Sequence, residues 1–405
     1  MLLAKVWYFL STGGQAFVLP YFNVYFDQLG FSKDAIGVLS ALRPWLSAPC
    51  AVLLCALADR LSCHTSLLVV TFAASLLLRC LLLLVPPHFL TVAALVLLSD
   101  CIGAPVVAIV DATVVGACKS DGDYGKYRMW ASAAWGGLSV VAGSLVAQRG
   151  LGPGFFMYLL IRFAATSFGR SLRIREADSE AEPEAAEYGV GRLQEGGLGS
   201  PGVHGVEHAG VPAAAVLVFM WRALIIGLGL GTIGNFLFLH VEELGGTASL
   251  MGLMLFFNCV TEVPAFHFQS VILDRLPVPL VFNGSMLLLA LRLAGYGFLP
   301  RLHSPWPVLA LELLHGCTFA SSWGAGIVHC KRLAPPHLNA SMQGLFSSLY
   351  GGVGSGLGAL LGGVLMQQLG GQALFFICSL VVLAGWLVGY LVELLLVRRG
   401  RQAQA

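Results

Sequence analysis

Six charged residues lie inside segments of this chain that are otherwise apolar enough to cross a bilayer. They are Asp100, Asp111, Arg128, Glu262, Arg292 and Glu312. On membrane-insertion scales, a charged side chain at the centre of the hydrocarbon costs about 2.5 to 3.5 kcal/mol. Such side chains should therefore face a protein interior or a wet cavity, and together they are typical of a polar pathway through a membrane.

Glu312 and His315 form the clearest chemical pair. They are one helical turn apart, so their side chains meet on one face of a helix. The proton affinity of a buried carboxyl depends on desolvation and on nearby cations, and Arg292 in the preceding apolar segment can supply the cation. We hypothesise that Glu312 carries a proton, that His315 hydrogen-bonds Glu312 or a solute, and that Arg292 tunes the acid. The alternative is a static cluster that joins two helices.

A second cluster of polar side chains is expected in the amino-terminal half of the chain. Asp100 and Asp111 are eleven residues apart, which returns to nearly the same helix face. Arg128 is the natural partner of Asp111, although a cation near a helix end can also extend to the membrane surface.

Glu262 is a third acid within an apolar segment, and Asn258 lies one turn before it. Pro264 follows closely and can free a backbone carbonyl to line a cavity. We therefore expect Asn258 and Glu262 to contact a solute.

The composition identifies the class of protein. Hydrophobic residues make up 57% of the 405 residues, which is more than an ordinary soluble domain contains. Apolar segments of about 20 residues, enough to span a bilayer, recur twelve times, six before and six after a polar interval. They lie near 5–27, 36–58, 66–85, 89–117, 126–147, 151–169, 213–239, 248–271, 279–300, 305–328, 341–366 and 372–397.

Other function classes find no support in the sequence. The net charge of +2 comes without a basic block outside the spans, so we expect no nucleic-acid partner. The cysteines lie mainly in apolar segments, where they act as small hydrophobes. We find no clustered nucleophile or metal-ligand set and expect no enzyme, no metal and no cofactor.

The polar interval divides the chain into two similar halves. We expect bundles at 1–169 and 213–397, a flexible linker at 170–212 and a tail at 398–405. Asp59-Arg60-Leu61 and Asp274-Arg275-Leu276 occupy the same place in each half, as in transporters built from parallel repeats. We expect these Asp and Arg residues to act in conformational gating, or else simply to anchor helix ends at the headgroups.

Basic residues of the short loops favour one orientation. With twelve spans, most of them fall on the side of both termini, and only Lys33, Arg149 and Arg301 fall on the other. The positive-inside rule then predicts cytoplasmic termini and a cytoplasmic linker.

Several strings resemble a known family. They include PYFNVYFDQLGFSKDAIGVLSALRP, GAPVVAIVDA and YGKYRMWASAAWG in the first half, and TEVP, ELLHGCTFASSWGAG and QGLFSSLYGGVGSGLG in the second. The chain thereby resembles the lactose-permease-like branch of the major facilitator superfamily, and particularly the eukaryotic proteins of the macrophage MHC receptor 2 homologue type. The resemblance implies an all-α membrane protein with twelve transmembrane helices in two six-helix bundles.

The resemblance also implies roles for individual residues. Arg128 and Trp135 match an arginine that binds the sugar and a tryptophan on which the sugar stacks, although Trp135 can equally be a packing residue. Arg292, Glu312 and His315 are similar to a proton-coupling set, but this chain reads Glu-x-x-His in the reverse order. Ala108 stands where the permease has its sugar-binding acid.

The expected function is secondary transport of a small polar organic solute, coupled to protons, by a monomer that alternates between two open states. The alternative is a transport-inactive receptor or scaffold that keeps the fold.

Overall fold

Helices form the described part of the chain almost entirely. The computed structural model describes residues 2–117, 123–171, 213–333 and 339–402, and it contains no strand within these ranges. The expected linker at 170–212 therefore falls almost wholly outside the described residues.

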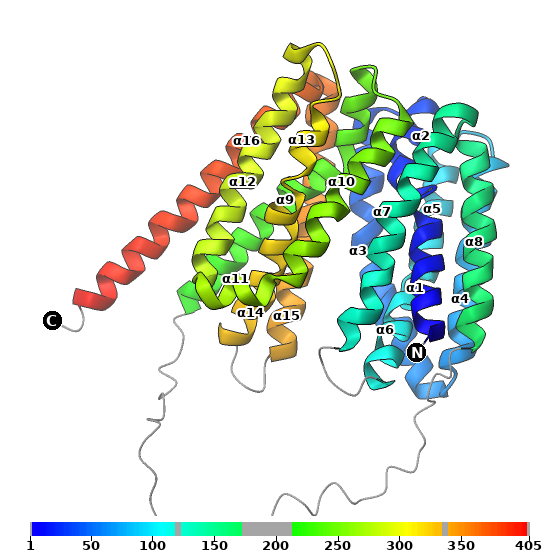
Figure 1. The fold of residues 1–405 in the computed structure, drawn as a ribbon, viewed down its shortest axis with the longest axis horizontal. Helices are drawn as coiled ribbons and strands as arrows, with labels where there is room; N and C mark the ends of the chain where they lie inside the picture. The colour runs from blue at the N-terminus through cyan, green and yellow to red at the C-terminus, as the bar shows by residue number, and fades with distance from the viewer. Residues whose placement is uncertain (1, 118–122, 172–212, 334–338, 403–405) are drawn as a thin grey trace, which may run out of the picture.

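The first half contains the elements that build spans one to six. Figure 1 shows them as one bundle that begins with α1. Their bounds are α1 Leu2–Gln15, η1 Leu19–Tyr21, α2 Phe22–Gln28, α3 Lys33–Leu61, α4 His64–Cys80, η2 Leu81–Leu83, α5 Phe89–Gly103, α6 Pro105–Ala117, α7 Asp123–Arg149 and α8 Leu151–Ser171.

The second half contains the elements that build spans seven to twelve. Their bounds are α9 Ala213–Glu243, α10 Ala248–His267, α11 Gln269–Arg275, α12 Val278–Phe298, η4 Leu299–Leu302, α13 Val308–Glu312, η5 Gly316–Ala320, α14 Ser321–Leu333, α15 Asn339–Ser347, η6 Ser348–Gly354 and α16 Ser355–Gln402. α16 covers two spans, separated at Gly370, whose φ of 80° is a left-handed value that glycine adopts easily. It also continues beyond residue 397, where the sequence placed the end of the last span.

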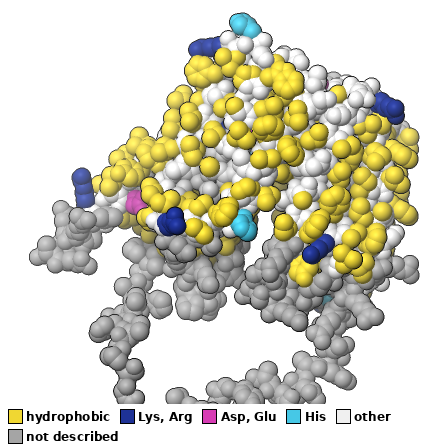
Figure 2. Space-filling model, in the orientation of Figure 1, with side chains coloured by type: hydrophobic (Ala, Val, Ile, Leu, Met, Phe, Trp, Pro, Cys, Tyr) yellow, Lys and Arg dark blue, Asp and Glu magenta, His cyan; other side chains and the backbone are white. Residues whose placement is uncertain are grey.

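The twelve-helix architecture is confirmed. Nine helical stretches of the described residues are long and apolar enough to cross a membrane, and one of them, Gly344–Leu396, holds two spans. The two remaining spans are interrupted, the first by the 3₁₀ turn at η1 and the tenth by the π segment at η5. The surface agrees, because Figure 2 shows mostly hydrophobic side chains across the middle of the molecule.

The two halves touch at one end of the molecule, which we call the closed end. It carries the turns at Gly30, Gly150, Gly245 and Gly370. The amide of Asn23 donates to the carbonyl of Asn235 at 2.8 Å near this end, joining the first and seventh spans.

Two helix crossings add to this contact, α3 against α16 and α7 against α10. Towards the opposite end, which carries the start of α1 and the end of α8, Figure 1 shows the lower parts of α6 and α7 apart from α14 and α15.

Candidate functional site

A central cavity of about 470 Å³ lies between the halves. Its wall includes Leu19 and Pro20 of η1, Trp135 of α7 and residues of α9, α10, α12 and both π segments. Five of the expected site residues of the second half line this single cavity: Asn258, Glu262, Arg292, Glu312 and His315.

Arg292 is the centre of the polar network in this wall. Its side chain is 0% exposed, and that of its ion-pair partner Glu312 is 1% exposed, with 2.9 Å between Nη2 of Arg292 and Oε2 of Glu312. A buried cation in a membrane protein needs acceptors on every side. Arg292 finds further acceptors in Thr318, at 3.1 Å, and in Asn258, at 3.4 Å.

Tyr296 completes a closed triangle with the ion pair. Its hydroxyl accepts from Nε of Arg292 at 2.5 Å and donates to Oε1 of Glu312. Tyr296 follows Arg292 by four residues, so both side chains lie on one face of α12. Each carboxylate oxygen of Glu312 is thus held by a different donor.

His315 links this buried triangle to a more open acid. Its Nδ1 lies 3.1 Å from Nη1 of Arg292, and its Nε2 lies 3.6 Å from Oε2 of Glu262. The His315 and Glu262 side chains are 20% and 18% exposed, whereas Glu312 is enclosed. Ionisable side chains therefore form a continuous row that leads from the cavity into the protein interior, in the order Glu262, His315, Arg292 and Glu312.

Irregular helix geometry positions these side chains. α13 ends at Glu312, and the π segment η5 begins directly after His315. The other π segment, η6, contributes Tyr350 and Gly351 to the same cavity. Single-turn π segments recur at functional sites because they widen the helix and redirect side chains.

The expected pairing of Asp111 with Arg128 is wrong. Asp111 instead accepts a hydrogen bond of 2.5 Å from the hydroxyl of Tyr8, and Arg128 lies over the Tyr8 ring at 5.5 Å. Tyr8 in α1 stands between the two charges because its ring offers a face to the cation and its hydroxyl reaches the acid.

Asp100 belongs to a different cluster from Asp111. Its carboxylate receives Nε of Arg43 at 2.6 Å and also contacts Nη2 of Arg79. The single acidic face expected for the fourth span is therefore two separate sites with different partners.

The four proposed gating residues lie at helix ends away from the closed end. Arg60 is in the last turn of α3 and Arg275 is in the last turn of α11, and both are exposed. The side chains of Asp59 and Asp274 lie outside the described part of the structure, so the gating role stays a prediction.

With this geometry established, comparisons with known proteins identify the family. The family model described as the MFS_1 like family matches residues 1–377. The chain belongs to this family. It is thus a membrane transporter of the major facilitator superfamily.

Individual relatives agree with this assignment. The maltose permease of Geobacillus stearothermophilus is 26% identical over 404 residues, covering 98% of this chain and 95% of the permease. The human major facilitator superfamily domain-containing protein 6-like is 26% identical over 164 residues, which cover 40% of this chain and 27% of that protein.

Solved structures show the same fold. A variant of the nucleoside transporter NupG superposes with a TM-score of 0.79 at 16% identity, covering 96% of this chain and 99% of that one. A variant of the peptide transporter POT gives a TM-score of 0.70 at 15% identity, covering 98% and 94%.

Sequence reasoning missed several buried polar residues of this MFS_1 like protein. Tyr296 and Tyr8 carry no charge and so gave no signal in an apolar span. Arg79 and Arg162 did carry a signal, since each is a cation within an otherwise apolar stretch, and a complete search for charges would have found them.

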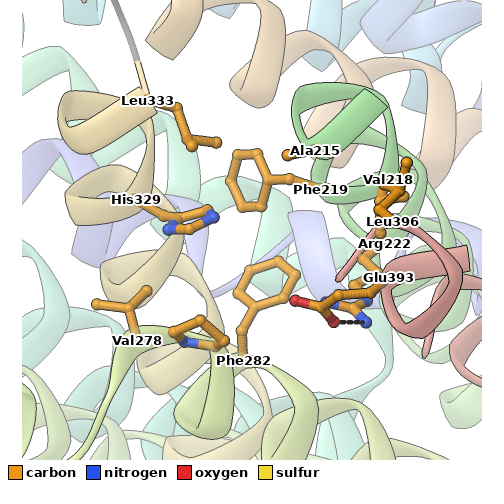
Figure 3. A pocket seen from close by; sticks show the side chains of 11 residues that line it. Ala215, Val218, Phe219, Arg222, Val278, Phe282, His329, Leu333, Glu393 and Leu396 are labelled. Carbon is orange, nitrogen blue, oxygen red and sulfur yellow. Dashed lines mark hydrogen bonds and ion pairs between the residues drawn. The ribbon is translucent and has the colours of Figure 1, made fainter. Parts of the chain in front are cut away.

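A second pocket, of about 360 Å³, lies within the second half (Figure 3). Phe219, Phe282 and His329 face it, and the ion pair of Arg222 with Glu393, at 2.7 Å, closes one side. None of its lining residues lines the central cavity, so it is separate from the site described above.

Proposed function

We propose that this protein moves a small polar organic solute together with protons, by alternating access of the central cavity. The observation that carries the proposal is the buried triangle of Arg292, Tyr296 and Glu312, connected through His315 to the cavity acid Glu262. A fixed cation holds Glu312, and protonation of that acid removes its negative charge from the triangle. Protonation therefore weakens the ion pair that holds Arg292. The packing of α10, α12 and α13 then changes when Glu312 binds or releases a proton.

The solute is proposed to lie against the walls of both halves. Trp135 offers a ring for stacking, while Asn258 and Glu262 offer hydrogen-bonding groups from α10. Asp111 and Arg128, joined through Tyr8, are the further polar groups proposed for the first half, and neither lines the central cavity in the described state. Since two relatives carry the names maltose permease and nucleoside transporter, hydroxylated solutes are the first to test.

Several finer assignments belong to the same proposal. We assign the chain to the lactose-permease-like branch of the superfamily, to the macrophage MHC receptor 2 homologue type, and treat it as a monomer of two six-helix bundles, 1–169 and 213–397. Both termini are cytoplasmic in this proposal because most basic loop residues gather at their end. The closed end then faces away from the cytoplasm.

The first experiment finds the solute. Thermal unfolding of the purified protein is measured against sugars, nucleosides and small carboxylates at two pH values, because a ligand that binds only the folded state stabilises it by mass action. A transporter gives a specific, pH-dependent stabilisation by one class. If a stabilising ligand is found but is never accumulated by vesicles, the alternative of a transport-inactive receptor is favoured.

The second experiment tests the proton role. Wild type, Glu312→Gln or Asp34→Asn is reconstituted into vesicles with an imposed pH gradient, and uptake of the solute found above is followed. Glu312→Gln should lose pH-driven accumulation while retaining exchange of solute across the membrane, because Gln cannot release a proton. Asp34→Asn, which removes an exposed acid in the first turn of α3 and outside the central cavity, should behave as wild type. Undiminished pH-driven accumulation by Glu312→Gln would contradict the hypothesis that Glu312 carries the proton.

A further inference from the structure

We propose that the first half holds a small monovalent anion against Arg162, at a site distinct from the central cavity. Arg162 lies in the middle of α8, and its side chain is 7% exposed. Its guanidinium lies 4.5 Å from the ring centre of Phe72 and 5.2 Å from that of Tyr158. Among the described residues, its enclosed Nε has no hydrogen-bond partner.

The nearby acid does not neutralise Arg162. Asp100 contacts both Arg43 and Arg79, so one carboxylate already serves two guanidinium groups. Arg79 and Asp100 are close enough to Arg162 to interact with it electrostatically. The interior of this half thus gathers three arginines around one acid.

No other acid of the described first half faces this cluster. Asp111 accepts from Tyr8, and Asp27 pairs with Lys33 at 2.5 Å at the closed end. Asp34 lies in the first turn of α3, at the same end. An uncompensated buried cation is strongly unfavourable, even when aromatic rings surround it. A resident anion supplies the missing charge and the missing acceptor together.

The surroundings are built to hold the Arg162 side chain in place. A Cβ at Gly14 of α1 would lie 2.6 Å from Cγ of Arg162, so this glycine leaves the room that the arginine occupies. Trp7, whose ring centre is 6.2 Å from that of Phe72, has an enclosed indole N–H that also lacks a described acceptor. Arginine and the indole N–H are donors only, so both groups need an acceptor, and a bound anion can supply one.

The site is compatible with a small inorganic anion such as chloride, or with a carboxylate group. Neither Arg162, Phe72 nor Tyr158 lines the central cavity. A halide ion bound within the bundle is therefore the first ligand to test, and the carboxylate group of a solute is the second.

The test measures thermal unfolding of the purified full-length protein at constant ionic strength. Chloride and bromide are compared with gluconate, which is too large for an enclosed site, and acetate provides the carboxylate arm. Halide should raise the unfolding midpoint by roughly 1 to 3 °C per tenfold increase in concentration above its dissociation constant. Arg162→Gln should lose this dependence.

A matched control is Arg301→Gln. Arg301 also lies over a phenylalanine, 5.1 Å from the ring centre of Phe298, but it is exposed. This variant should keep the full halide dependence. Stabilisation by acetate and not by halide, lost in Arg162→Gln, supports the site and identifies the carboxylate as its ligand.

A second measurement needs no variant. Broadening of the ³⁵Cl resonance by wild-type protein should be reversed by bromide, because both halides compete for one site. If the wild type shows neither anion-dependent stability nor bromide-sensitive broadening, or if Arg162→Gln shows the same dependence as wild type, the proposal is overturned.

Discussion

Tyr296 hydrogen-bonds to both members of the buried ion pair of Arg292 and Glu312. Its hydroxyl is both acceptor from Arg292 and donor to Glu312. Tyr296→Phe should lower the free energy of unfolding by about 1 to 3 kcal/mol, because two buried charged groups each lose a hydrogen-bond partner. Thermal or denaturant unfolding of the purified protein measures this change.

Tyr390→Phe is the matched control for this prediction. Tyr390 is 41% exposed and stacks on Trp386 with ring centres 5.5 Å apart. Its substitution should alter stability by less than about 0.5 kcal/mol. Equal effects of the two substitutions would show that the Tyr296 hydroxyl is not part of a stabilising network.

Asp100 should be the most sensitive acid of the first half. Asp100→Asn leaves the buried Arg79 and the partly exposed Arg43 without their shared counter-charge, so we expect a loss of about 3 to 5 kcal/mol in stability. Asp34→Asn, at the exposed start of α3, should lose less than about 1 kcal/mol. Comparing unfolding midpoints of the two variants tests this, and a small effect at Asp100 would contradict it.

Charge and spacing predicted part of the candidate site and not the rest. Glu312 and His315 could be paired from their one-turn separation, and the structure brings Arg292 to them. The contact of Arg292 with Tyr296 also follows helical spacing, but a tyrosine in an apolar segment is usually a packing residue and was not selected. Asp111 and Arg128 were paired by charge alone, because nothing in the sequence reveals that Tyr8 comes between them.

At the scale of elements, two glycine crossings close one end of the molecule. A Cβ at Gly143 of α7 would lie 2.5 Å from the carbonyl oxygen of Ala248 and 3.0 Å from the Cα of Gly252. A Cβ at Gly37 of α3 would likewise lie 2.5 Å from the carbonyl oxygen of Ala359 and 2.9 Å from the Cα of Gly363. Both crossings bring backbones together through small residues.

Gly143→Ala should therefore favour the state in which the closed end opens. The added methyl group cannot fit without moving α7 from α10, and overpacking of this kind costs about 1 to 3 kcal/mol. Distances between spin labels on the two halves at the closed end would report the shift towards longer values.

Gly137→Ala in the same helix provides the control. A Cβ at Gly137 meets no atom within 4 Å, so this substitution should leave the distances unchanged and stabilise α7 by up to about 1 kcal/mol. If Gly143→Ala leaves the distances at wild-type values, the crossing does not limit opening.

The helical spans themselves were predictable because their length and apolarity are set by the bilayer. The breaks within them were not. η5 and η6 interrupt spans ten and eleven as π segments, which depend on tertiary packing around the cavity rather than on local composition. Pro20 signals the break at η1, but a proline does not tell whether a helix bends or is interrupted.

At the scale of the whole molecule, the contacts at the closed end follow the relation between the halves. Asn23 of the first span meets Asn235 of the seventh, which is the corresponding span of the other half. The second and eleventh spans meet at one glycine crossing, and the fifth and eighth meet at the other. The second span corresponds to the eighth, and the fifth corresponds to the eleventh, so the two crossings are equivalent under exchange of the halves. This symmetry is expected when two similar bundles rock about a shared cavity.

This organisation predicts that each half assembles as a unit. A chain cut between residues 190 and 191, expressed as two pieces, should form a complex that retains ligand-dependent stability, because α8 and α9 belong to different bundles. Co-purification through a tag on one piece, followed by thermal unfolding, measures the outcome. A cut at Gly245, between α9 and α10 of one bundle, should assemble less well, since it leaves α9 on a different piece from α16, its main packing partner in the same bundle. Equal assembly of the two cut chains would argue against two independent six-helix units.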